Sequence, residues 1–215
     1  MTPDQRITAE NSVDHLDMQE LLWLGPLFVL RKIVEVNPEV AGVNFWKYVY
    51  RPVQFAEQGE NPYWLDKDDL FDDGKIKEIV DSLPEDCQLG IYSRVVLSSG
   101  ASAHIPLMDL AVKKGPESLS LIQERFRKAG MTRGWLLETG ESYHYYGSDL
   151  LTGPDRWIDF MGRCLLTGVV HTRENIVQLA DPRYIGHSLR RGGCVLRITT
   201  KDDKTFEPKV VASIG

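Results

Sequence analysis

The 215-residue chain has the composition of an ordinary globular protein, with 42% hydrophobic and 26% charged residues, and it is long enough for a sizeable core. Its formal net charge of −6 and pI near 5.4 argue against a protein that coats nucleic acid by bulk positive charge. Three widely spaced cysteines, at 87, 164 and 194, provide neither a disulfide framework nor zinc-ligand spacing, so we expect a reducing cytoplasm.

The first half of the chain predicts a mixed set of helices and strands. In order, we expect a loose polar leader (1–14), one or two packed helices interrupted near Pro26 (17–36), a strand (41–53), an acidic surface connection (57–74), a short helix (75–83) and a strand (87–99). The apolar run at 21–30 is far shorter than the roughly 20 residues that cross a bilayer, so no membrane role is expected. The polar start also lacks the features of a signal peptide.

The second half predicts a regular βαββαβ order. The expected elements are a strand (104–112), a helix (115–130), two strands joined by a turn at Thr139-Gly140 (132–138 and 141–147), a helix (152–166) and a strand (194–200). This order is typical of the ferredoxin-like or RRM-like fold, so we expect an α+β protein with one antiparallel sheet over about 104–200. Residues 1–100 would be an N-terminal α/β elaboration of the same domain, and residues 101–215 would carry the functional motifs.

Polar residues with chemical potential lie on two of these strands. Alternation puts Ser142 and His144 on one face, and the Thr139-Gly140 turn would place Trp135 opposite His144. The first and third strands of a ferredoxin-like sheet are neighbours, so Asp109 is expected to approach His144. A carboxylate and an imidazole on an open face can hold a divalent cation and a phosphate, although a strand with a merely solvated polar face is the alternative.

A concentration of positive charge follows in residues 179–201, around Gly192 and Gly193. Its charged residues include Asp181, Arg183, Arg190, Arg191 and Arg197. Arginines beside a glycine pair suit a phosphate, through bidentate hydrogen bonds and close backbone approach. The alternative is a solvated basic loop that balances the acidic connection at 57–74.

Three segments, "HIPLMDL", "GESYHYYG" and "DPRYIGHSLRRGGCVLRIT", resemble the motifs of the archaeo-eukaryotic primase superfamily, and more narrowly its primase-1D-like branch. The resemblance covers about residues 104–201. It implies catalytic roles for Asp109, His144 and Asp181, with Mg²⁺ or Mn²⁺ held by Asp109 and Asp181. It also implies a nucleotide phosphate site, whose members would be Ser142, His144, Arg183, Arg190, Arg191 and Arg197. The superfamily has a second acid two residues after the first, where this chain has Ala111.

That difference leads to the prediction of a primase-polymerase-like domain that binds a nucleotide or a nucleic-acid end, with weakened or lost nucleotidyl transfer. One alternative is an active metal-dependent nucleotidyltransferase that recruits Glu138 or Glu141 to complete its metal site. Another is a non-catalytic protein-interaction module on a relic primase fold. The resemblance further implies a prokaryotic, cytoplasmic protein whose partners are nucleoside triphosphates, nucleic acid and other proteins of a multi-gene mobile-element or defence system.

Overall fold

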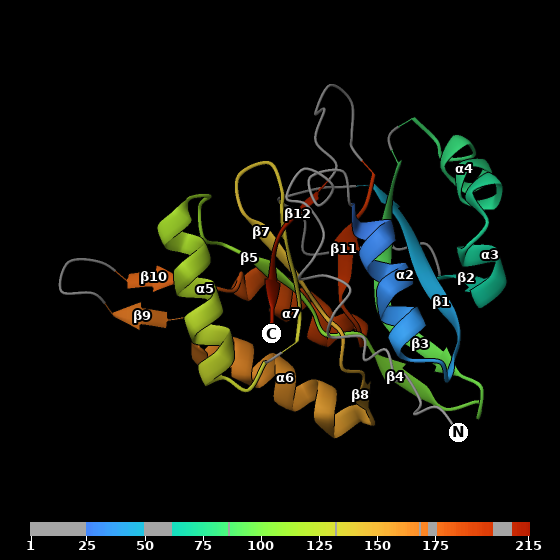
Figure 1. Cartoon of the computed structure of the whole chain (residues 1–215). Helices are drawn as coiled ribbons and strands as arrows, with labels where there is room; N and C mark the ends of the chain where they lie inside the picture. The colour runs from blue at the N-terminus through green and yellow to red at the C-terminus, as the bar shows by residue number, and fades with distance from the viewer. Residues whose placement is uncertain are drawn as a thin grey trace, which may run out of the picture.

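The computed structural model describes residues 25–49, 62–85, 87–131, 133–167, 169–171, 176–199 and 208–215. The expected leader at 1–14, the start of the 17–36 helical region and the end of the 41–53 strand lie outside the described residues. The mixed architecture in Figure 1 confirms the α+β class. No helix among the described residues is long and apolar enough to cross a membrane.

The first of two larger sheets is antiparallel and is built around the long strand β3. Its path runs β2 (Tyr63–Asp66), β1 (Val40–Val49), β3 (Cys87–Leu97), β4 (Ser102–His104) and β8 (Leu151–Thr152), and β11 (Val195–Arg197) also pairs with β3. This sheet therefore takes strands from both halves of the chain. Helix α2 (Pro26–Val36) lies over it in Figure 1, with Val29, Leu30 and Ile33 buried at helical spacing in the common core. After β2 the chain forms two further helices, α3 (Lys67–Leu70) and α4 (Asp73–Asp81).

The second large sheet is also antiparallel and carries the motif-bearing strands. Its order is β12 (Lys209–Ile214), β6 (Gly134–Glu138), β7 (Tyr143–Gly147) and β5 (Leu107–Leu110). Helices α5 (Pro116–Lys128) and α6 (Pro154–Thr167) confirm the two expected helices. The Phe126 ring of α5 meets the Tyr145 ring of β7 edge-on, with centroids 4.7 Å apart, so α5 covers the Tyr143 and Tyr145 face of the sheet. A small hairpin of β9 (Val169–His171) and β10 (Ile176–Gln178) and helix α7 (Pro182–Arg191) complete the described fold.

The expected pairing of the fourth strand of the ferredoxin-like sheet is wrong. Residues 195–197 form β11 as expected, but β11 pairs with β3 in the first sheet. The position beside β5 is taken by an antiparallel bridge between Leu110 and Ala180, in which Ala111 N–H donates to the Leu179 carbonyl oxygen. β12 occupies the opposite edge, beside β6. Because residues 179–180 already occupy this edge of β5, β11 cannot pair there.

Three further expectations about local structure are wrong. The strand expected over 104–112 is two strands, β4 and β5, which belong to different sheets, because Pro106 between them has no N–H to donate to a ladder. The acidic connection 57–74 holds β2, α3 and the start of α4 in its described part. The arginine-rich segment, for which no helix was expected, contains α7. Its ending at Gly192, which has φ of 75°, is the left-handed helix stop that glycine favours.

Candidate functional site

His144 and Asp109 face each other across β7 and β5. The register pairs Asp109 with His144, and the gap between His144 Nε2 and Asp109 Oδ1 is 3.7 Å. Residues directly opposite each other in a sheet point to the same face, and Tyr145 lies on the other face, against α5. The expectation that Asp109 and His144 lie side by side, on the face away from α5, is therefore confirmed. At 3.7 Å the two groups are too far apart for a direct hydrogen bond.

Asp181 extends this pair into a row of three residues. The bridge at Leu110 and Ala180 places Asp181 directly opposite Asp109, with Asp181 N–H donating to the Asp109 carbonyl oxygen at 3.1 Å. Asp181 is also the N-cap of α7, where its Oδ1 accepts from the Arg183 N–H at 2.8 Å. The row His144–Asp109–Asp181, from here the polar row, thus unites three residues separated by up to 72 positions in the chain.

Burial sets the charges along the polar row. Partial burial and, to a smaller extent, the nearby Asp181 carboxylate raise the pKa of Asp109 from 3.8 to about 7, against the opposing effect of the Arg197 guanidinium. Burial, helped by Arg197, lowers the pKa of His144 from 6.5 to about 3. His144 is thus neutral at physiological pH and forms no ion pair with Asp109. It can still donate or accept one hydrogen bond at each ring nitrogen.

Arg197 is the arginine of the basic segment that approaches the polar row. It lies on β11, paired with Gly90 of β3, and its charge acts on both Asp109 and His144. Arg197 Nε and His144 Nδ1 are buried atoms without a hydrogen-bond partner, and so is the hydroxyl of Tyr146, whose ring centroid is 6.4 Å from that of His144. Buried donors are normally paired. These three side chains can therefore form further hydrogen bonds close to the Asp109 and Asp181 carboxylates.

Two of the expected phosphate-binding residues, Arg190 and Arg191, lie at the end of α7 away from the polar row. Arg190 and Arg191 end α7, a helix about 15 Å long, whereas Asp181 begins it. The Arg191 guanidinium lies over the Trp46 ring of β1, 5.3 Å from its centroid. Arg183 is exposed at the start of α7, and its backbone N–H donates to Asp181 Oδ1. The basic segment is thus divided between the two ends of a helix and a separate strand.

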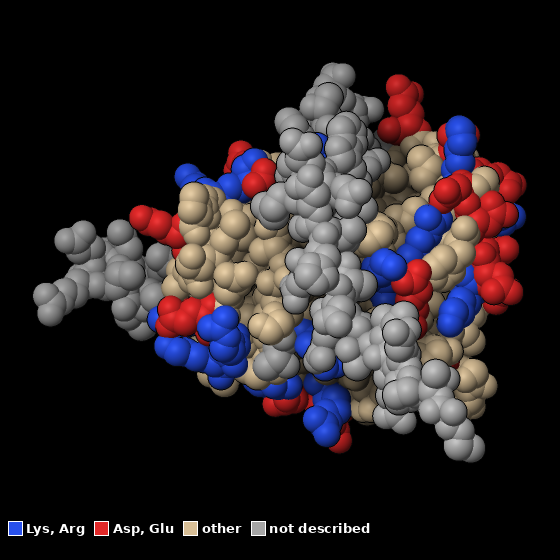
Figure 2. Space-filling model, in the orientation of Figure 1, with Lys and Arg blue, Asp and Glu red and all other residues tan. Residues whose placement is uncertain are grey.

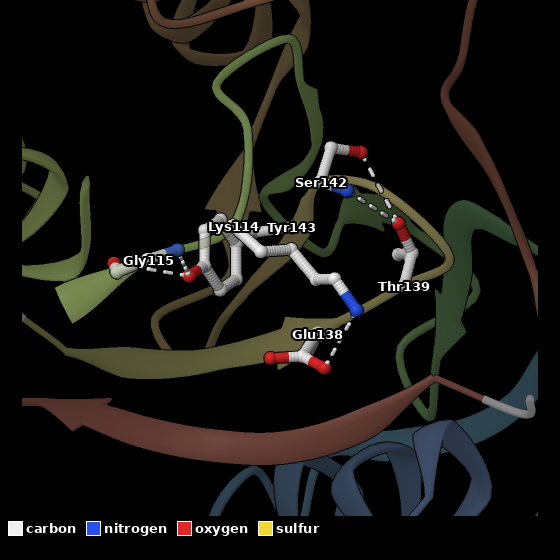
Figure 3. A network of polar contacts seen from close by, with 6 residues as sticks. All are labelled: Lys114, Gly115, Glu138, Thr139, Ser142 and Tyr143. Atoms are coloured by element: carbon white, nitrogen blue, oxygen red, sulfur yellow. Dashed lines mark hydrogen bonds and ion pairs between the residues drawn. The ribbon is translucent and has the colours of Figure 1, made fainter.

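The turn before β7 differs from the expected one. The register pairs Leu137 with His144 and Trp135 with Tyr146, so the expected pairing of Trp135 with His144 is wrong. The Thr139 N–H donates to the Ser142 carbonyl oxygen at 2.9 Å, which places Gly140 and the residue after it at the tip. Figure 3 shows that the Ser142 and Thr139 hydroxyls bond to each other at this end of the hairpin, at 3.1 Å.

Figure 3 also shows how the loop after β5 is fastened to this hairpin. Lys114 Nζ forms an ion pair with Glu138 at 3.0 Å, and the Gly115 N–H donates to the Tyr143 hydroxyl at 2.9 Å. Glu138 is opposite Tyr143 in the register and therefore lies on the face away from His144. Glu138 is consequently not available to complete a metal site at the polar row.

Two features of the site were missed at the sequence level. One is a role for Tyr146, which alternation along the strand had already placed on the face of His144. The other is the start of α7, where an Asp followed by Pro182 is the common N-cap and first-position pair of a helix. That pair could have located Asp181 at a helix terminus.

The two carboxylates of the polar row are the candidate ligands for a divalent cation. Asp109 and Asp181 present hard oxygen ligands side by side, and their mutual repulsion, which raises the pKa of Asp109, would be relieved by a bound cation. No group of three or more His, Cys, Asp or Glu side chains suited to a metal occurs in the part of the chain that the structure describes. A second cation would need another acid, and Ala111 provides none.

Comparison with known proteins gives one match. The family model described as archaeo-eukaryotic primase 1D-like matches residues 67–209, about two thirds of the chain. No curated protein and no solved structure matches the chain. The matched range contains all three members of the polar row and Arg197, and it confirms the resemblance drawn from the three sequence motifs. The chain belongs to the archaeo-eukaryotic primase 1D-like family.

Proposed function

We propose that the protein is a primase-polymerase-like domain that binds a nucleoside triphosphate, or the phosphorylated end of a nucleic acid, at the polar row. The observation that carries the proposal is the single row of His144, Asp109 and Asp181 on one face of the sheet. Family membership supports a nucleotide or nucleic-acid ligand. Neutral His144 and charged Arg197 would donate hydrogen bonds to phosphate oxygens.

The two acids would hold one Mg²⁺ or Mn²⁺ ion, and this ion would neutralise part of the phosphate charge. With one cation, the attacking and leaving oxygens of a nucleotidyl transfer are not both stabilised. Asp109 and Asp181 would therefore support binding better than catalysis, and we expect weak or absent primer extension. In this proposal the central phosphate-binding residues are His144 and Arg197.

Isothermal titration calorimetry with ATP and dATP in the presence of MnCl₂ tests this proposal. His144→Ala should weaken binding by about 1–3 kcal/mol, the range for a hydrogen bond to a charged group. Arg197→Met should weaken it similarly, whereas Arg156→Met, on the exposed side of α6, should not. Affinities that are equal for wild type, His144→Ala and Arg197→Met would refute a phosphate site at the polar row.

Primer extension and de novo primer synthesis test the catalytic part. The wild type should show at most feeble product with Mg²⁺, and Asp109→Ala should abolish whatever remains. The control Asp155→Asn removes one acid from the first turn of α6 and should leave product unchanged. Robust synthesis that survives Asp109→Ala would place the chemistry away from the polar row.

A further inference from the structure

The negative charge of the protein is concentrated away from the polar row. Residues 62–85, which form β2, α3 and α4, contain eight acidic residues and three lysines, a net charge of −5 out of −6 for the whole chain. Figure 2 shows these acidic side chains gathered on the side of the molecule where Figure 1 places α3 and α4. Such a field attracts basic partners and repels nucleic acid.

Trp64 of β2 is an aromatic side chain held rigidly at this surface. A Cβ atom at Gly42 of β1 would lie 2.2 Å from the Trp64 ring, so the indole rests directly on the β1 backbone. Its Nε1–H donates to Asp66 Oδ1 at 3.0 Å, which fixes the ring in its plane. Trp64 is nevertheless 39% exposed. A large, immobilised and solvent-facing indole has the properties of an interface anchor, because little conformational entropy is lost when a partner covers it.

The eight acids of residues 62–85 include paired and unpaired ones, and Asp72 and Glu85, like the three acids nearest to Trp64 in sequence, form no ion pair with any described residue. Further along, three acids form ion pairs within the chain, which are Asp73 with Arg31, Glu78 with Lys75 and Asp81 with Lys77. Asp66, Asp68 and Asp69 form no ion pair with any described residue. Their charge is therefore open to an external cation.

Neighbouring rings already contact cations of the chain itself. Lys47 Nζ lies 5.4 Å from the centroid of the Tyr63 ring, and the Arg31 guanidinium lies 5.8 Å from that of Phe71. Among the described residues no cation is placed over Trp64, although tryptophan is the strongest aromatic partner for a cation. A partly exposed indole in the most acidic segment of the chain fits an arginine or lysine side chain by cation–π contact and charge together.

We propose that Trp64, Asp66, Asp68 and Asp69 form a docking surface for a basic, arginine- or lysine-containing segment of a partner protein. Charge complementarity selects this occupant, because a nucleic acid would meet the most acidic part of the chain. β1 and β3 lie between β2 and β11, which places the surface about 14 Å from the strand of Arg197. The docking surface is separate from the polar row and does not depend on the function proposed for that row.

Fluorescence anisotropy with a labelled octapeptide of alternating arginine and valine tests the surface on the full chain. Wild type should bind this peptide with an affinity that falls as salt rises, and should not bind the same peptide with glutamate in place of arginine. Trp64→Ala should weaken binding at least about tenfold. Asp68→Asn with Asp69→Asn should weaken it about three- to tenfold and flatten the salt dependence, without touching a buried residue.

Two controls separate this surface from general attraction to an acidic protein. Leu166→Ala removes the most exposed large apolar side chain of α6, and Glu117→Gln with Asp155→Asn removes the same two charges from α5 and α6. Both should keep wild-type affinity. The proposal is overturned if the charge-matched control weakens binding as much as Asp68→Asn with Asp69→Asn. It is equally overturned if a single-stranded octanucleotide, and not the basic peptide, loses binding on Trp64→Ala.

Discussion

Replacing Asp109 by asparagine should make the protein more stable at neutral and higher pH. The folded state holds the pKa of Asp109 at about 7, against 3.8 for a solvated carboxyl, because the group is partly buried and faces Asp181. Between pH 3.8 and about pH 7 the folded state binds more protons than the unfolded state, so the free energy of unfolding falls as pH rises. Asparagine has the same shape and carries no charge, so it avoids this loss.

The size of the effect follows from the pKa difference and the exposure of the group. At about 1.4 kcal/mol per pKa unit, the change from 3.8 to about 7 sets an upper limit of about 4 kcal/mol. Because 34% of the Asp109 side chain is exposed, solvent screening reduces the expected gain to about 1–2 kcal/mol. At pH 5 the wild-type carboxyl is protonated in the folded state. The two proteins should therefore differ less at pH 5 than at pH 8.

Urea denaturation in EDTA at pH 5 and at pH 8 measures this difference directly. EDTA removes divalent cations, which would otherwise stabilise the wild type by binding Asp109 and Asp181. Asp155→Asn serves as the exposed control and should change stability by less than about 0.5 kcal/mol at either pH. An Asp109→Asn protein that is less stable than wild type at pH 8, or whose difference from wild type is the same at both pH values, would show that Asp109 is not a strained carboxylate.

Four other changes or measurements address the site and its support. Ala111→Asp should raise the Mn²⁺ stoichiometry measured by calorimetry from one to two, and an unchanged stoichiometry would contradict the missing-acid explanation. The His144 ring should not titrate in NMR spectra between pH 5 and 8, because its pKa is lowered to about 3; a midpoint near 6.5 would show that the ring is solvated. Gly42→Ala should destabilise the fold by about 1–3 kcal/mol in urea denaturation, since the added methyl group meets the Trp64 ring; no loss would mean that the ring moves freely. Phe126→Ala should cost about 3–5 kcal/mol by the same measurement, because the ring is buried against Tyr145; a loss below about 1 kcal/mol would argue against that packing.

Local sequence patterns were sufficient for much of the fold and for the centre of the site. Alternation and turn residues located β6 and β7, and the apolar spacing of Ile122 and Phe126 located α5. The order of elements then predicted that Asp109 and His144 lie on neighbouring strands, because a helical crossover followed by a hairpin brings the first and third strands together. These conclusions depend on contacts between elements that are close in sequence.

The remaining parts of the site depend on pairings that local patterns do not encode. The bridge at Leu110 and Ala180 places Asp181 beside Asp109, and the pairing of β11 with β3 brings Arg197 to the same corner. Each of these contacts joins segments about 70 or more residues apart in the chain. The short segments at 179–181 and 195–197 could each pair with more than one strand edge, and a shift of one residue would turn their side chains to the other face. The sequence by itself therefore determined most elements of the second half and the His144–Asp109 pair, and it named Asp181 and Arg197 as candidates. Only the tertiary structure decided how those two residues reach the polar row, because edge availability and register are properties of the assembled sheets.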